Sequence, residues 1–228
     1  MPKDRPYIVL NFAMSVDGKI STTQRGRLRF SSSEDWQLMD QIRSNSDAVL
    51  IGANTIRSED PPFRIRSKKR RDERKALGKP PHPISIVLSR SLDLPLSGRY
   101  FQQQHMERII VTTGHAPQHR IEEIRPFGEI IQTGGAQVDF HELCRILINK
   151  NIQYLLVEGG GEVNMAFFDA GLVDEIYITL CPVIIGGREA PTPADGNGFK
   201  ANHLVKLELI QTRQIGHELF QRYRVIGN

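Results

Sequence analysis

The sequence is poor in cysteine and contains no long apolar run. Its two cysteines, Cys144 and Cys181, are too few for a disulfide framework, and neither clusters with histidines as metal ligands do. We therefore expect two buried thiols and a reduced, cytoplasmic setting. No apolar stretch approaches the roughly 20 residues that cross a bilayer, and the N-terminal residues lack the apolar core of a signal peptide. These absences argue against a secreted or membrane protein.

Motifs of several enzyme classes are also missing. The sequence contains no G-x-S-x-G nucleophile turn, no phosphate-binding Walker loop and no H-x-E with P-C-x-x-C, the pattern of the zinc deaminases. We therefore expect neither a metal centre nor a covalent nucleophile. The site must work with the residues that remain, namely glycines, arginines and a few acids.

Positive charge is confined to one segment. The formal net charge is +4, but Arg66 to Lys79 carries a surplus of +6, so the rest of the chain is slightly acidic. A basic run of this kind can bind nucleic acid. However, no aromatic residues are interleaved with it to stack on bases. We therefore interpret residues 67–83 as a basic, proline-rich loop in solvent, and we expect neither a nucleic-acid nor a membrane partner.

Hydrophobic periodicity predicts an α/β fold with a mixed, mostly parallel central sheet flanked by helices. In residues 175–185, Pro182 predicts a sheet edge or a bulge. One helix is expected after the serines at 31–33, a second over 140–148, and a third after the glycines at 159–161, with Val163, Ala166, Phe167 and Ala170 facing inward. The expected strands are 7–13, 47–53, 84–88, 109–112, 130–131, 154–157 and 175–185, followed by a closing hairpin of 205–215 and 218–226.

The most informative local feature is the segment Leu155-Leu156-Val157-Glu158-Gly159-Gly160-Gly161, a strand followed by glycines and a helix. Glycines let backbone N–H groups approach a pyrophosphate, and the helix N-terminus adds partial positive charge. The segment is not the G-x-G-x-x-G fingerprint, so it does not predict a standard dinucleotide fold. A tight turn without a ligand explains the glycines equally well.

Four other groups follow predicted strands, where α/β proteins bind their ligands. Each also has a plain structural interpretation: a helix cap for Thr55, a loop ion pair for Asp17 and Lys19, surface charge for the arginines, and a turn for Ser89. Together with the glycines they suit hydride transfer, in which a cofactor supplies the chemistry and the protein positions the reactants. The groups are Gly52 to Thr55, Asn11 to Ile20, the arginines Arg43, Arg64 and Arg66, and Ser89-Arg90.

These motifs, in this order, resemble the riboflavin-biosynthesis pyrimidine reductases, and the resemblance covers nearly the whole chain. The residues that carry it are Asn11-x-Ala13-x-Ser15-x-Asp17-Gly18-Lys19-Ile20, Arg43-x3-Asp47-Ala48-x3-Gly52-x2-Thr55, Asp60-Pro61, Glu158 to Gly161, and Val173-Asp174-Glu175 with Pro182 and Gly186-Gly187. The resemblance implies a single dihydrofolate-reductase-like domain over 1–228 and a homodimer. It also implies that NADPH reduces C1′ of the ribose of a phosphorylated (di)amino-ribosylaminopyrimidinone, in its opened imine form.

The resemblance also assigns site residues. Lys19 and Glu158 are expected to deliver a proton and orient the ribose hydroxyls, with Asp17 in support. Cofactor contacts fall on Ala13, Thr55, Glu59, Ser89, Gly160, Gly161, Glu162, Val163, Asn164, Met165 and Ala166, and substrate contacts fall on Arg43, Phe63, Arg66 and Glu158.

Several positions depart from the family pattern. Glu59 replaces an aspartate, Glu162 places a carboxylate at the start of the pyrophosphate-binding helix, and Arg27 and Arg29 stand where the family has a small polar residue and a tryptophan. The deaminase motif is absent, so the substrate is either the diamino or the deaminated pyrimidine. A reductase of the same fold that acts on another small substrate is the alternative.

Overall fold

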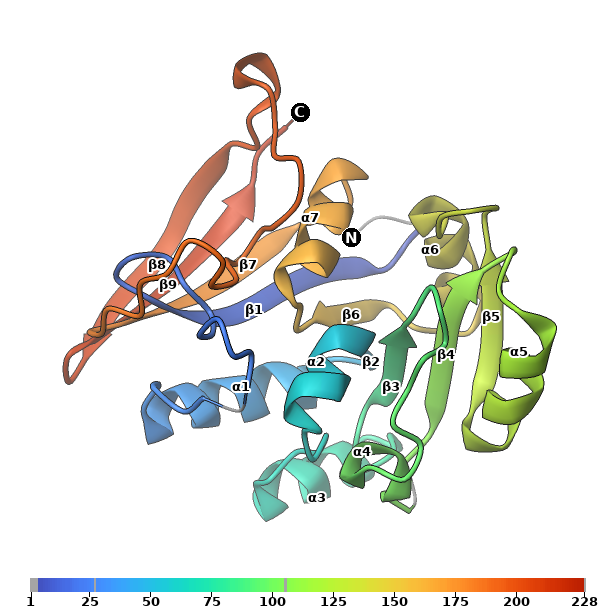
Figure 1. The fold of residues 1–228 in the computed structure, drawn as a ribbon. Helices are drawn as coiled ribbons and strands as arrows, with labels where there is room; N and C mark the ends of the chain where they lie inside the picture. Colours follow the sequence, from blue (N-terminus) through green and yellow to red (C-terminus); the bar gives the residue numbers. More distant parts are fainter. Residues whose placement is uncertain (1–3, 27, 105, 228) are drawn as a thin grey trace. The chain divides into compact units, whose positions relative to one another are not determined.

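A computed structural model describes residues 4–26, 28–104 and 106–227, and it contains one nine-stranded mixed sheet (Figure 1). The hydrogen-bonded strand order is β5-β4-β3-β2-β6-β1-β7-β9-β8. The strands are β1 (Tyr7–Ser15), β2 (Ala48–Gly52), β3 (Ile84–Leu88), β4 (Arg108–Thr113), β5 (Glu129–Thr133), β6 (Tyr154–Val157), β7 (Glu175–Cys181), β8 (Leu207–Ile215) and β9 (Glu218–Val225). The helices are α1 (Ser33–Asn45), α2 (Ala53–Glu59), α3 (Lys68–Ala76), α4 (Arg99–Gln102), α5 (Gln118–Ile124), α6 (Phe140–Asn149) and α7 (Gly161–Asp169), with short 3-10 turns η1 (Arg125–Phe127) and η2 (Ala201–His203).

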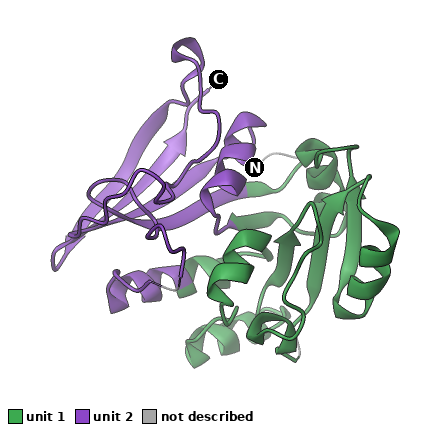
Figure 2. Cartoon of the chain, viewed as in Figure 1, with its two compact units in different colours: residues 1–7, 40–156 green, residues 8–39, 157–228 purple. Residues whose placement is uncertain are grey.

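The chain divides into two compact units (Figure 2). Unit 1 comprises residues 1–7 and 40–156, and unit 2 comprises residues 8–39 and 157–228. The β2–β3, β3–β4 and β4–β5 pairings within unit 1 are parallel. In unit 2, β1 and β7 pair in parallel, whereas β7–β9 and β8–β9 are antiparallel. The predicted mixed, mostly parallel sheet with a terminal hairpin is therefore confirmed.

The core of unit 1 forms where the sequence is continuously apolar. All five residues of β2 and all six of β4 are buried, as expected for strands covered on both faces. The predicted helix over 140–148 is confirmed as α6, which buries Leu143, Cys144 and Leu147. Asp139 caps it by accepting a hydrogen bond from the Glu142 N–H at 2.9 Å.

The predicted loop over residues 67–83 is wrong for its first half, because Lys68–Ala76 forms the helix α3. Ser67 caps this helix by accepting from Arg70 N, and Lys68 pairs with Asp72 at 2.6 Å one turn later. The buried Arg74 donates to the carbonyls of Ser44, Ser46 and Pro80. The helix therefore depends on capping and on one arginine that satisfies buried carbonyls rather than on an apolar stripe.

Unit 2 also differs from expectation at two places. Strand β7 ends at Cys181, directly before Pro182, and lies between β1 and β9, so the proline ends the strand rather than marking an edge or a bulge. Helix α7 buries Asn164, Met165 and Phe167, whereas only Phe167 of the four residues expected to face inward is buried. The segment 192–195, which the periodicity does not predict, packs on the first turn of α7 and accounts for the burial of Asn164. Asn164 Nδ2 donates to the Pro193 carbonyl there at 2.8 Å.

Candidate active site

The glycine turn of unit 2 connects β6 to α7 as predicted. Gly159 has φ +82°, a conformation that favours glycine, and the Gly159–Gly160 peptide bond is cis. The Gly160 carbonyl accepts from Val163 N and Asn164 N, both at 3.0 Å, and so closes the first turn of α7. Glu162 is exposed, so its carboxylate does not fill the turn. A helix start with glycines on this side suits the pyrophosphate of a dinucleotide.

Gly161 has a packing role in addition to any contact with a cofactor. A Cβ at this position would lie 2.3 Å from the Thr192 carbonyl oxygen and 2.6 Å from Asp195 Oδ2. Asp195 N donates to the Gly161 carbonyl at 3.1 Å, and the Asp195 carboxylate accepts from Thr192 N and Oγ1. Residues 192–195 therefore fix the start of α7.

The loop after β1 holds Asp17 and Lys19 separately rather than as an ion pair. Ser15 Oγ donates to Asp17 at 2.6 Å and accepts from Lys19 N at 2.9 Å. Asp17 also accepts from Ile185 N and Gly186 N, and the Ser15 hydroxyl and these amides lower the pKa of Asp17 to about 2. Lys19 Nζ donates to the Ala190 carbonyl at 2.9 Å. Asp17 thus ties the residue 185–186 backbone to the loop that carries Lys19.

A group of polar side chains near the start of α1 was not predicted. Glu218, the first residue of β9, is buried and accepts from Ser32 N at 2.8 Å and from Ser32 Oγ at 2.5 Å. Ser32 Oγ in turn caps α1 by accepting from Asp35 N at 3.3 Å. In the sequence, Asp35 has the pattern of an ordinary first-turn acid, because its neighbours come from distant strands.

Burial raises the pKa of Asp35, although the hydroxyls of Thr179 and Ser31 oppose this shift. The carboxylates of Glu218 and Glu158 raise the pKa further. The adjacent Cys181 is buried as expected. Its burial and the nearby Glu218 carboxylate raise the pKa of its thiol to about 12, which keeps it protonated.

In unit 1 two of the residues expected to contact substrate, Arg43 and Phe63, lie against each other. The guanidinium of the buried Arg43 lies 4.8 Å from the centre of the Phe63 ring and donates to the Arg64 carbonyl at 3.0 Å. Asp40, one turn earlier on α1, accepts from Arg66 N at 2.9 Å and from Ser67 N at 2.8 Å. Asp40, which sequence reasoning missed, therefore fixes the segment 63–67 together with Arg43.

The other expected cofactor residues of unit 1 follow β2 and β3. Thr55 is the third residue of α2, whose cap is Gly52, so the interpretation of Thr55 as a helix cap is wrong. Glu59 ends α2, and Asp60 follows it with φ 43° and accepts from the backbone N–H groups of Arg99 and Tyr100. Ser89 is buried and accepts from Leu92 N at 3.0 Å, so its hydroxyl keeps a proton to donate.

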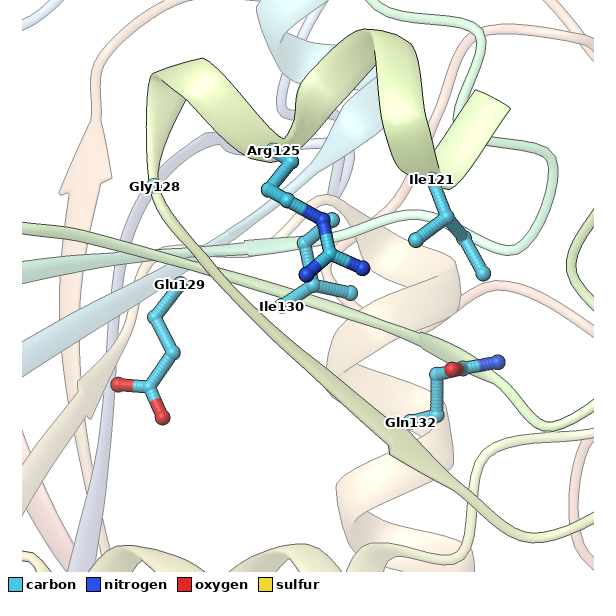
Figure 3. Close-up of a pocket in the computed structure, with 6 residues that line it drawn as sticks. All are labelled: Ile121, Arg125, Gly128, Glu129, Ile130 and Gln132. Atoms are coloured by element: carbon cyan, nitrogen blue, oxygen red, sulfur yellow. The ribbon is translucent and has the colours of Figure 1, made fainter. Parts of the chain in front are cut away.

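Arg27 and Arg29 are the two remaining departures from the family pattern. Arg29 stacks over the Trp36 ring, 5.8 Å from its centre, and Arg27 lies outside the described residues. A pocket beside β5 in unit 1 is lined by Ile121, Arg125, Gly128, Glu129, Ile130 and Gln132, and none of these is a predicted site residue (Figure 3). No described helix is long and apolar enough to cross a membrane.

Comparison with known proteins identifies the family. The family model for the RibD C-terminal domain matches residues 6–220. A 2,5-diamino-6-ribosylamino-4(3H)-pyrimidinone 5′-phosphate reductase of Archaeoglobus fulgidus is 35% identical over 207 residues, covering 90% of this chain and 94% of that protein. Among solved structures, a pyrimidine reductase-like protein of Corynebacterium diphtheriae superposes with a TM-score of 0.85 at 22% identity, covering 99% of this chain and 94% of that one. Dihydrofolate reductase of Enterococcus faecalis gives 0.50 at 11% identity, covering 96% of each chain.

The fold and these matches define an oxidoreductase with a dihydrofolate-reductase-like fold, as the sequence motifs predicted. Within that class, the chain belongs to the RibD C-terminal domain family.

Proposed function

We propose that this chain uses NADPH to reduce the ribose of 2,5-diamino-6-ribosylamino-4(3H)-pyrimidinone 5′-phosphate to the ribitylamino compound, in the cytoplasm, as a step of riboflavin biosynthesis. The observation that carries the proposal is the match to the A. fulgidus reductase, which covers 90% of this chain and 94% of that protein, and that protein bears the substrate in its name. The bound cofactor supplies the hydride.

The cofactor residues fit a phosphate-bearing dinucleotide. The glycine turn has no side chains between Glu158 and Glu162, and Glu162 is exposed. In our proposal Gly160 to Ala166 contact the pyrophosphate, and Ala13, Thr55 and Glu59 contact the rest of the cofactor. Ser89 has a hydroxyl proton to donate and the neighbouring Arg90 is exposed, which suits the 2′-phosphate that distinguishes NADPH from NADH.

The substrate residues fit a phosphate monoester. Arg43 is held by the Phe63 ring and the Arg64 carbonyl, and Asp40 holds the backbone of Arg66. A guanidinium group held like that of Arg43 recognises phosphate oxygens with little loss of side-chain entropy. We assign Glu158 and Lys19 to the ribose hydroxyls and to proton delivery, and Asp17 to support of the Lys19 loop.

We also propose a homodimer that forms through the terminal hairpin. All nine residues of β8 are exposed, and the exposed apolar side chains of the hairpin region include Leu207, Leu209, Ile210, Ile215, Leu219 and Ile226. Exposed apolar side chains on a terminal hairpin suit the self-complementary interface of a two-fold dimer.

The function is tested by steady-state oxidation of NADPH with the diamino and the deaminated substrate side by side, and with NADH in place of NADPH. We expect turnover with the diamino compound and NADPH. Turnover with the deaminated compound alone would reassign the substrate. Absence of turnover with both compounds would overturn the proposal in favour of a related reductase with another substrate.

A further inference from the structure

The polar side chains near the start of α1 lie beside residues that the resemblance assigns to cofactor and substrate binding. Ala13, an expected cofactor contact on β1, is the register partner of Thr179 on β7. The Thr179 and Ser31 hydroxyls and the carboxylates of Glu218 and Glu158 all act on Asp35. Glu158 is an expected substrate contact. Asp35 therefore neighbours residues expected to contact cofactor and substrate, within one unit of the chain.

A buried polar atom on this face of the sheet calls for a ligand. Thr179 is fully buried, and its hydroxyl interacts with the carboxylate of Asp35. Asn11 Oδ1 is buried without a partner among the described residues, and Asn11 lies two positions before Ala13 on the same side of β1. Buried polar atoms of this kind are rare unless something else completes their bonding.

We propose that Asp35 is a catalytic acid of this site, which protonates the ring oxygen O4′ of the substrate ribose as the C1′–O4′ bond breaks. This inference rests on the proposed function. The exocyclic nitrogen on C1′ forms the C1′=N bond with its lone pair, O4′ leaves with the Asp35 proton as a hydroxyl, and reduction at C1′ returns the lone pair to nitrogen. One proton is consumed, and solvent restores it to Asp35.

The surroundings of Asp35 suit this role better than those of the other acids. Glu218 is occupied by both hydrogen bonds from Ser32, and Asp17 is held ionised by amides and a hydroxyl. Asp35 lies among the carboxylates of Glu218 on β9 and Glu158 after β6, which together with burial favour its protonated form at higher pH.

The test compares Asp35→Asn with Glu34→Gln, a change of the exposed neighbouring acid on the same turn of α1. We expect Asp35→Asn to lower kcat about 100-fold or more, the range of general acid catalysis, while calorimetric binding of the substrate without NADPH stays near that of the unaltered chain. Glu34→Gln should keep its kcat. Equal losses in both variants, or a full kcat in Asp35→Asn, would overturn the proposal.

Two further readouts separate acid catalysis from a structural role. In the unaltered chain, kcat should fall as pH rises through the raised pKa of Asp35, because only the protonated acid donates, and Asp35→Asn should lose this limb. With NADPH deuterated at both C4 positions, the isotope effect on kcat should shrink in Asp35→Asn, because ring opening becomes limiting.

If Asp35→Asn does not fold, the pH profile of the unaltered chain still tests the proposal, because a profile without a descending limb contradicts it. If the unaltered chain oxidises no NADPH with substrate, the proposed function has failed. If the unaltered chain turns over substrate but Asp35→Asn has no effect on kcat, only the inference about Asp35 is overturned.

Discussion

At the scale of single residues, Gly161 shows how closely the glycine turn is packed. Gly161→Ala places a methyl group 2.3 Å from the Thr192 carbonyl, so the backbone of one segment must move. We expect the free energy of unfolding to fall by about 1–3 kcal/mol, the range for overpacking, and NADPH binding to weaken because the start of α7 shifts. Chemical denaturation and NADPH titration measure the two effects. Gly26→Ala, which meets open space, is the control, and equal behaviour of the two variants would contradict the packing argument.

The carboxylate of Asp17 makes the stability of the loop after β1 depend on pH. The hydroxyl of Ser15 and the amides of Ile185 and Gly186 lower its pKa from 3.8 to about 2. Because the folded-state pKa is depressed, the stability it contributes is present above 3.8 and is lost as pH falls towards 2. The difference in Tm between the unaltered chain and Asp17→Asn should therefore be full near neutral pH and shrink over that window. A difference in Tm that is constant with pH would show that the amide bonds do not depend on the charge.

At the scale of elements, α1 holds the segment 63–67 through Asp40. Asp40→Asn removes the charge from two backbone hydrogen bonds at 2.8–2.9 Å, which should cost about 1.5–3 kcal/mol in the free energy of unfolding. The KM for the phosphorylated substrate should rise, because Arg66 loses its anchor, while the KM for NADPH should stay unchanged. The control is Asp72→Asn on α3, whose exposed pair with Lys68 is screened by solvent and contributes little to stability. A parallel rise of both KM values would refute the link between Asp40 and the phosphate site.

Elements with a clear period could be predicted from the sequence, and elements without one could not. Strands β3 and β6 and the hairpin around Gly216 match the predictions because apolar runs, alternation and a turn glycine mark them. Helix α3 lacks an apolar stripe, and what fixes it, the contact of Arg74 with the Ser44 and Ser46 carbonyls, is tertiary.

The residues of the candidate site also differ in whether the sequence could predict them. The glycine turn and Arg43 carry local signals, whereas Asp35, Thr179 and Glu218 meet only through the register of β7 and β9.

At the scale of the whole molecule, the proposed dimer gives a direct test. Leu209→Arg places a charge on β8 where a leucine is 51% exposed, and we expect it to shift the chain to monomers in sedimentation analysis. Leu77→Arg changes a leucine in unit 1 that is 77% exposed and should leave the assembly intact. A chain that is monomeric before any substitution, or a dimer that Leu209→Arg does not weaken, would exclude this hairpin as the interface.

The bond between Ser32 and Glu218 joins the helix that carries Asp35 to the first residue of β9. The hairpin that we propose to pair between protomers therefore also supplies the acceptor that orders the start of α1. Association and catalytic competence then become thermodynamically linked, since whatever stabilises the hairpin also stabilises the productive arrangement of α1. Dilution of the protein, which favours monomers, should consequently lower the activity of each chain.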